Sequence, residues 1–265
     1  MMKKVIGRPK LLKDAPFHYC PGCGHSIIHR LLAEVIEELR IRDITIGIPP
    51  CGCAVLAYYY IDVDMVEAAH GRATAVATGI KRSLPDRVVF TYQGDGDLAA
   101  IGTSEVIHSA NRGECITTIF VNNGVYGMTG GQMAPTSILG QKTTTTPLGR
   151  SLKNDGPPLK MCEFLSPLQG AAYLARGSVH DARNIQKTKR YIRESFRMQM
   201  ENQGFSMVEI LSPCPSNWKM SAVKSAKWIE EVMVKHFPLG VYKNQREEGP
   251  GAGVQSQSAD ASEKP

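Results

Sequence analysis

The chain has 265 residues, 42% of them hydrophobic, and a formal net charge of +6. This length favours one large α/β domain with a full hydrophobic core, and no run approaches the roughly 20 apolar residues of a membrane-spanning helix. No apolar stretch follows the basic N-terminus and no basic cluster is interleaved with aromatic residues, so the sequence indicates a cytoplasmic protein without signal peptide, membrane partner or nucleic acid partner.

The predicted elements begin with an N-terminal arm over residues 1–19, which Pro9 and Pro16 interrupt. Hydrophobic spacing then predicts helices and strands in alternation. They are helices over 26–39, 71–84 and 101–111, and strands over 44–48, 88–93 and 116–121. The last two strands and the helix between them are read as one βαβ unit.

The second half of the chain starts with a long irregular segment. Residues 124–158 are rich in Gly, Thr and Pro, and a connection of this length is usually functional or disordered. The elements expected after it are a small-residue segment at 170–175, a polar helix over 181–203, a strand over 205–211 and a closing helix around 228–233. The tail has almost nothing to bury and is predicted to be disordered. The domains are therefore an arm (1–19), an α/β domain (20–243) and a tail (244–265).

Two polar motifs follow apolar runs that read as strands. The turn Gly94-Asp95-Gly96-Asp97 follows one run, and the pair Asn122-Asn123 follows the next. Both therefore lie at carboxyl ends of strands, where open α/β sheets bind ligands. The small residues of the turn can admit a diphosphate to backbone N–H groups, and a carboxylate with a carboxamide offers the oxygen ligands that Mg²⁺ prefers. The two motifs predict a diphosphate–Mg²⁺ site.

Seven cysteines in a chain without an export signal indicate reduced thiols, some of them ligands. Cys20 and Cys23 form a CxxC turn, Cys51-Gly52-Cys53 follows the first strand, and Cys214 follows the last. Four thiolates at one sheet edge suit either a [4Fe–4S] cluster or a structural Zn²⁺, and a lone CxxC would also suit a redox dithiol. Cys115 and Cys162 are read as buried or incidental thiols.

The order of these motifs resembles the β subunit of the 2-oxoacid:ferredoxin oxidoreductases, which binds thiamine diphosphate. The matching stretches span about residues 17–220 and are Tyr19–His25, Glu67–Ala73, Gly94–Gly102, Asn122–Gln132 and Ser212–Pro215. The resemblance implies the doubly wound, mostly parallel sheet of the thiamine-diphosphate-binding (pyrophosphate-type) fold.

The resemblance also implies which residues hold the cofactor. Asp95, Asn123 and the backbone carbonyl of Val125 would bind Mg²⁺. The positions that would contact thiamine diphosphate are Cys51, Gly52, Cys53, His70, Gly71, Arg72, Gly96, Asp97, Gly127, Met128 and Thr129.

A [4Fe–4S] cluster is implied on Cys20, Cys23, Cys53 and Cys214. The family pattern around the third ligand is usually Gly-Cys-Ser, whereas this chain has Gly52-Cys53-Ala54. Cys53 matches in register, and Cys51 is an extra thiol that offers an alternative ligand. The change from Ser to Ala removes one hydrogen-bonding group near the cluster or the cofactor.

The implied reaction is the oxidative decarboxylation of a 2-oxo acid with coenzyme A, which gives acyl-CoA and CO₂ and reduces ferredoxin. In this family the glutamate that activates the cofactor lies on the α subunit, so the chain would act only with that partner, to which small γ and δ subunits can be added. No catalytic side chain is assigned here, because structural roles are favoured for Glu67 and Glu105. Some relatives carry a lysine at the position of Gly130, and its absence favours a branched substrate such as 2-oxoisovalerate over 2-oxoglutarate.

Two other interpretations compete with this one. A subunit of a non-redox thiamine diphosphate decarboxylase would need no CxxC cluster, and such enzymes carry both cofactor-binding modules on one long chain. A zinc-stapled α/β scaffold would use the four cysteines but would leave Asp95 and Asn123 without a purpose.

Overall fold

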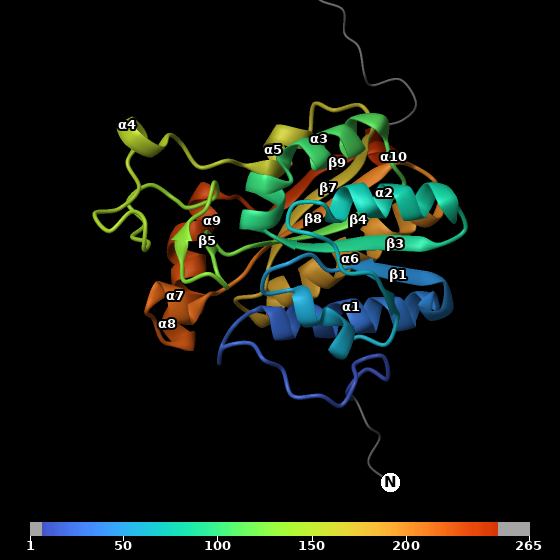
Figure 1. Ribbon diagram of the computed structural model, residues 1–265, viewed down its shortest axis with the longest axis horizontal. Coiled ribbons are helices and arrows are strands. Elements are labelled where there is room, and N and C mark those ends of the chain that lie inside the picture. The colour runs from blue at the N-terminus through green and yellow to red at the C-terminus, as the bar shows by residue number, and fades with distance from the viewer. Residues whose placement is uncertain (1–6, 249–265) are drawn as a thin grey trace, which may run out of the picture.

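The structure, a computed structural model, describes residues 7–248 and contains a seven-stranded sheet in the order β2-β1-β3-β4-β8-β7-β9 (Figure 1). Its strands are β1 (Thr45–Ile48), β2 (Asp64–Met65), β3 (Val88–Gly94), β4 (Thr117–Asn122), β7 (Ala171–Ser178), β8 (Phe205–Leu211) and β9 (Gly240–Asn244). All neighbours pair in parallel except β7 and β9. The inner strands are buried along their whole length, because both faces of the sheet are covered. The mostly parallel α/β sheet is confirmed.

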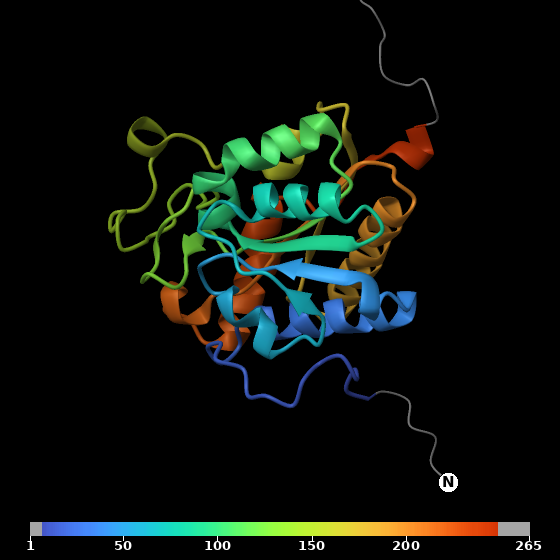
Figure 2. The ribbon, with the colours of Figure 1, turned by 45° about the vertical axis from the view of Figure 1, so that its right-hand side comes forward.

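Two layers of helices cover the sheet (Figures 1 and 2). On one face α1 (His25–Leu39) and α6 (Ala182–Met200) pack against residues such as Phe90 and Val208. On the other face α2 (Ala73–Ser83), α3 (Thr103–Arg112) and α5 (Met161–Leu165) enclose a second core around Phe120 and Met207. The parallel strands and the two helix layers make a doubly wound fold.

The carboxyl ends of β1, β3, β4 and β8 meet at one edge of the sheet, toward which the arrowhead of β1 points in Figure 2. Two later segments lie beyond this edge, the 124–158 loop and the helices α7 (Pro215–Trp218), α8 (Ala222–Trp228) and α9 (Val234–His236) (Figure 1). Open parallel sheets bind their ligands at this edge.

The 124–158 loop is ordered and has its own small elements, β5 (Val125–Tyr126), β6 (Gln132–Met133) and α4 (Leu152–Asp155). Arg150 is buried at its centre. The guanidinium of Arg150 donates hydrogen bonds to six backbone carbonyls, those of Ala134, Pro135, Ser137, Asp155, Gly156 and Pro157. One cation therefore replaces regular secondary structure as the partner of these carbonyls.

Several predicted boundaries change in the structure. The small-residue segment at 170–175 belongs to β7, and the closing helix contains a π-helical turn at Ile229–Met233 between α8 and α9. The arm packs on the domain, since Leu11 is buried and Leu12 bridges to Ile61. The expected tail boundary at 243/244 falls inside β9, and α10 (Gln245–Glu248) follows it. The rest of the tail (249–265) and residues 1–6 lie outside the described residues. Within 7–248, no helix is both long enough and apolar enough to span a membrane.

Candidate functional site

Asp95 follows β3 directly and is almost fully buried. One carboxyl oxygen, Oδ1, accepts from the backbone N–H of Gly96 at 3.0 Å, and Oδ2 accepts from the hydroxyl of Thr136 at 2.9 Å. Burial raises the pKa of Asp95 to about 7, although these hydrogen bonds favour the ionised form. A buried carboxylate with so little compensation fits a bound cation, which would restore full ionisation.

Asn123 follows β4, whose Val121 pairs with Gly94, the residue before Asp95, in the sheet register. The amide oxygen of Asn123 accepts from the backbone N–H of Val125 at 3.1 Å, and Asn122 makes the same kind of turn with Gly124 at 3.2 Å. Gly124 has a positive φ of 67°, which a residue with a side chain rarely adopts. Two successive asparagine turns thus hold the backbone that carries the predicted Mg²⁺ ligands.

Asp97 connects the glycine-aspartate turn to the 70–72 segment. Its Oδ1 accepts from the backbone N–H of Gly71 at 2.6 Å and lies 2.5 Å from Nδ1 of His70, and its Oδ2 accepts from Gln93 at 2.6 Å. The carboxylate is therefore already fully engaged by protein groups. Arg72 points elsewhere and pairs with Glu105.

Most of the predicted cofactor residues line one pocket at the carboxyl edge of the sheet. They are Cys51, Gly52, Cys53, His70, Asp95, Gly96, Asp97, Asn123, Val125, Gly127, Met128 and Thr129. Gly71 and Arg72 are not among the lining residues, and neither are Glu67, Glu105 or the Thr143–Thr146 run. Thr143 and Thr146 bond to each other inside the 124–158 loop instead. Glycine is needed at 96, because a Cβ there would lie 2.4 Å from the ring of Tyr126.

Cys51 and Cys53 line the same pocket, whereas the other predicted cluster thiols, Cys20, Cys23 and Cys214, are not among its lining residues. A Cβ on Gly127 would lie 3.0 Å from Sγ of Cys53, so this thiol touches the loop that follows Asn123. The CxxC turn packs on the segment that carries Cys214, because a Cβ on Gly24 would lie 2.4 Å from Oγ of Ser212. All seven cysteines are free, Cys162 is fully buried, and Cys51 is exposed at the pocket rim.

Burial and the neighbouring thiols control the ionisation of these cysteines. The pKa of Cys23 is raised to about 12 and that of Cys53 to about 11, mainly by burial and in smaller part by the neighbouring thiol of Cys214. The pKa of Cys214 is also raised, first by burial and then by Asp95 and Cys20. Each thiolate would repel the others, so these thiols stay protonated on their own. A bound metal would stabilise the thiolates and release their protons.

Within residues 7–248, no three His, Cys, Asp or Glu side chains are gathered tightly enough to hold one metal ion. A structural zinc ion needs four ligands at about 2.0–2.3 Å. Four soft sulfur donors from three segments, the Cys20/Cys23 turn, Cys53 and Cys214, form a donor set that both a tetrahedral zinc ion and a multi-iron cluster use.

Sequence analysis missed two residues of α7 that connect the thiols to the oxygen ligands. The amide of Asn217 donates to Sγ of Cys214 at 3.2 Å and to the carbonyl of Gly127 at 2.9 Å. The indole N–H of Trp218 donates to the carbonyl of Asn123 at 3.0 Å. The available signal was Pro215 after Cys214, because proline at the first turn predicts a helix that brings the next residues back over the thiol.

His25, the last residue of the CxxC-Gly-His motif, was also missed as a lining residue. Its Nδ1 lies 2.8 Å from the hydroxyl of Tyr92, and Tyr19 stacks on its ring with the centroids 4.7 Å apart. Burial lowers the pKa of His25 to about 3, so the imidazole is neutral. One wall of the pocket is therefore a neutral, polar ring.

The comparisons with known proteins agree with this geometry. Residues 51–210 match the family model described as the C-terminal TPP binding domain of thiamine pyrophosphate enzymes. A ketoisovalerate oxidoreductase subunit VorA of Methanothermobacter thermautotrophicus is 47% identical over 94% of this chain and 54% of its own length. The 2-oxoglutarate synthase subunit KorB of Methanocaldococcus jannaschii is 38% identical over 76% of this chain and 70% of its own.

Among solved structures, 2-oxoglutarate:ferredoxin oxidoreductase from Magnetococcus marinus, with 2-oxoglutarate, coenzyme A and succinyl-CoA bound, superposes with a TM-score of 0.73 at 26% identity. The match covers 94% of this chain and 88% of that one. The chain spans only about half the length of the VorA relatives. It belongs to the 2-oxoacid:ferredoxin oxidoreductase subunits that contain a thiamine-pyrophosphate-binding domain.

Proposed function

We propose that this chain is the thiamine-diphosphate-binding subunit of an enzyme that oxidatively decarboxylates a 2-oxo acid. With coenzyme A the products would be acyl-CoA and CO₂, and two electrons would pass to ferredoxin. The observation that carries the proposal is that the ends of the neighbouring strands β1, β3 and β4 bring Asp95, Asn123 and the free thiols of Cys51 and Cys53 to one pocket. A non-redox thiamine enzyme would have no use for those thiols.

Asp95, Asn123 and the carbonyl of Val125 would hold Mg²⁺, which would bind the diphosphate. Gly96 and Gly127 line the pocket and would face the cofactor, and Asp97 fixes His70 and Gly71 beside it. When bound, thiamine diphosphate supplies the nucleophile and the electron sink for decarboxylation. The protein's own contribution is to orient the cofactor and to exclude water from the buried carboxylate.

Cys20, Cys23, Cys53 and Cys214 would hold a [4Fe–4S] cluster. Contact of Cys53 with Gly127 favours it over the exposed Cys51 as the third ligand. The hydrogen bond from Asn217 to Sγ of Cys214 would be one of the contacts that set the reduction potential. The cluster would then border the cofactor directly.

The substrate side of the pocket favours a branched, uncharged side chain. Met128 is half exposed and lines the pocket, and a Cβ on Gly130 would meet no atom within 4 Å, so this loop offers an apolar group and space without a cation. We therefore propose 2-oxoisovalerate as the substrate and keep 2-oxoglutarate as the alternative. The relatives include a ketoisovalerate oxidoreductase subunit and a 2-oxoglutarate synthase subunit, so their names are compatible with either substrate.

The activating glutamate would come from a partner α subunit. Glu105 is paired with Arg72, and neither Glu67 nor Glu105 lines the pocket. The half-length match to the VorA relatives also supports a second chain or domain. Ferredoxin and small γ and δ subunits would complete the assembly, and seven free thiols suit the cytoplasm.

The test is metal analysis and activity of enzyme purified without air through a tag on this chain. We expect about four irons with equal acid-labile sulfide, a reduced-state EPR signal of a [4Fe–4S] cluster, and coenzyme A-dependent reduction of ferredoxin with 2-oxoisovalerate. Turnover with 2-oxoglutarate alone would move the assignment to the alternative substrate. Zinc without iron would contradict the redox function and support the zinc-stapled scaffold.

A further inference from the structure

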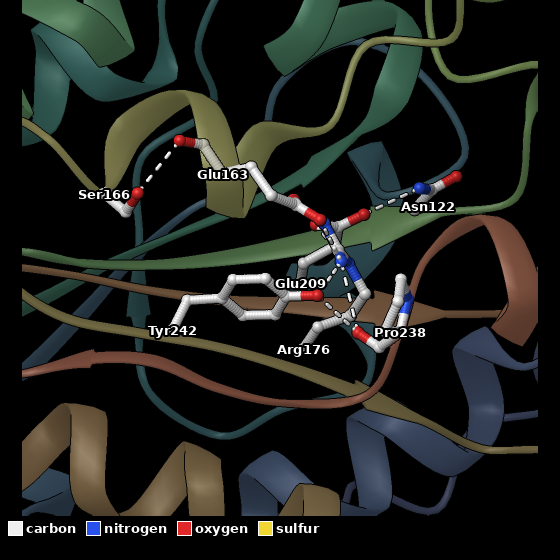
Figure 3. A network of polar contacts seen from close by, with 7 residues as sticks. All are labelled: Asn122, Glu163, Ser166, Arg176, Glu209, Pro238 and Tyr242. Atoms are coloured by element: carbon white, nitrogen blue, oxygen red, sulfur yellow. Dashed lines mark hydrogen bonds and ion pairs between the residues drawn. The ribbon is translucent and has the colours of Figure 1, made fainter.

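A chain of buried polar residues runs across the sheet and ends at Asn122 (Figure 3). Arg176 of β7 lies opposite Glu209 of β8, and Asn122 ends β4. The three side chains are completely buried. Charged groups are rare at such depth, because removing them from water costs several kcal/mol each.

The guanidinium of Arg176 is held at its outer end by several groups. Glu163 accepts two hydrogen bonds from it, at 3.0 and 2.5 Å, and the carbonyl of Pro238 accepts one at 3.2 Å. The hydroxyl of Tyr242 also contacts it. Figure 3 shows Glu163, Tyr242 and Pro238 around Arg176. Arg176 therefore has one orientation.

The inner end of the chain fixes Glu209 and then Asn122. Nε of Arg176 lies 2.9 Å from Oε2 of Glu209, a contact of opposite charges rather than an aligned hydrogen bond. The other oxygen, Oε1, accepts from Nδ2 of Asn122 at 2.8 Å. Because a carboxylate only accepts, the NH₂ group of Asn122 must face Glu209 and its Oδ1 must face the other way.

That orientation decides the backbone of the next residues. Oδ1 of Asn122 accepts from the N–H of Gly124 at 3.2 Å, while Ser137 and Gln141 donate to the carbonyl of Gly124 at 2.5 and 3.1 Å. Gly124 is thus fixed on both sides in its positive-φ conformation. The amide of Asn123 and the carbonyl of Val125 lie immediately before and after it.

We infer that Arg176, Glu209 and Asn122 form a positioning chain that sets the Asn123–Val125 backbone for metal binding. The inference rests on one part of the proposed function, namely that the Asn123–Val125 segment binds Mg²⁺ together with thiamine diphosphate. An apolar core would pack β7 against β8 without desolvating a charged pair, so the pair has a use other than stability. Groups that orient metal ligands in this way typically alter metal affinity about 10–100-fold when they are changed.

The decisive variant replaces Arg176→Met and Glu209→Met together. Exchanging a buried ion pair for apolar side chains of similar volume is often neutral or stabilising, so we expect an unchanged or higher unfolding temperature. Asn122 loses its acceptor, so we expect Mg²⁺ affinity at saturating thiamine diphosphate to fall about 10–100-fold, with kcat at saturating Mg²⁺ nearly retained. The affinity is measured in the assembled enzyme by calorimetric titration with MgCl₂.

Tyr242→Phe is the matched control, because it alters the outer end of the chain and leaves Asn122, Glu209 and Arg176 in place. We expect its Mg²⁺ affinity to match the wild type. Asn122→Ala removes the last link and should repeat the loss seen in the double variant. Equal losses in Tyr242→Phe and the double variant would overturn the inference, since the effect would then be global.

Hydrogen exchange at the Gly124 amide gives a second readout that needs no bound cofactor. We expect faster exchange in the double variant and no change in Tyr242→Phe. Unchanged exchange together with wild-type Mg²⁺ affinity would show that the network serves stability only. If wild-type enzyme failed to bind Mg²⁺ and thiamine diphosphate, the proposed function would fail, while the exchange comparison would still decide whether Arg176 and Glu209 set the Gly124 backbone.

Discussion

The oxygen side of the pocket (Asp95 and Asn123) is held by buried hydrogen bonds from the sheet and from the 124–158 loop. The thiol side (Cys20, Cys23, Cys53 and Cys214) comes from turns that pack closely on neighbouring segments at Gly24 and Gly127. One side is therefore fixed before any ligand binds, whereas the other has raised thiol pKa values and an exposed member, Cys20. The oxygen side should therefore determine the affinity for Mg²⁺. The thiol side should become ordered only when its metal binds.

The largest effect is expected on the thiol side with Cys214→Ser. Serine is a poor ligand for iron, so we expect the cluster to be lost and ferredoxin reduction to fall below detection. Iron and acid-labile sulfide per chain are the measurement. Cys115→Ser is the control and should keep its iron, because this thiol is not one of the four proposed cluster ligands.

Asp95→Asn breaks the oxygen side. Loss of a charge that binds the metal directly should weaken Mg²⁺ binding by more than the roughly 100-fold typical of groups that only orient ligands. Without Mg²⁺ the variant should be at least as stable as the wild type, because burial disfavours the ionised carboxylate. Calorimetric titration and urea unfolding check the two effects. A metal-free variant that unfolds at lower urea would contradict this account of Asp95.

These two outcomes concern residues that the sequence points to directly. Asp95 and Asn123 follow apolar runs, so parallel pairing alone brings them together. Thr136 carries no such signal, because its contact with Asp95 joins positions 41 residues apart through an irregular loop. Arg176 and Glu209 do stand out in the sequence, because each is a charged residue inside a largely apolar strand. The tertiary fold decides that β7 pairs with β8, and the local sequence pattern does not predict this pairing.

A pH effect on folding sharpens the account of the thiol side. His29 stacks on Tyr92 with the ring centroids 4.8 Å apart, beneath the CxxC segment, and burial holds its pKa well below 6.5. Below pH 6.5 the unfolded chain binds a proton there that the native state does not, so stability falls as the pH falls. His29→Phe should remove about 1 kcal/mol of this dependence between pH 6.5 and 5.5, because the unfolded imidazole goes from half protonated to almost fully protonated over that range. Urea unfolding at both pH values measures it, and equal slopes in variant and wild type would refute the assignment.

The smallest effect tests the connection between the two sides. Asn217→Leu keeps the shape of the side chain but removes the hydrogen bonds to Cys214 and Gly127. Loss of a neutral hydrogen bond costs about 1 kcal/mol, so Mg²⁺ affinity should fall roughly fivefold. The reduction potential of the cluster should also become more negative, because hydrogen bonds to sulfur raise it. Redox titration by EPR detects this, and an unchanged potential would mean that Asn217 joins the two sides without tuning the cluster.

The buried Arg150 should affect how easily proteases cut the chain during purification and in the cell. Proteases cut segments that can open into an extended backbone, and long loops are their usual targets. In the 124–158 loop, opening would break the bonds of one guanidinium to six carbonyls at once and would leave that cation buried without partners. The loop next to the pocket should therefore resist nicking as firmly as the sheet itself, even with Leu148 and Leu152 exposed at its surface.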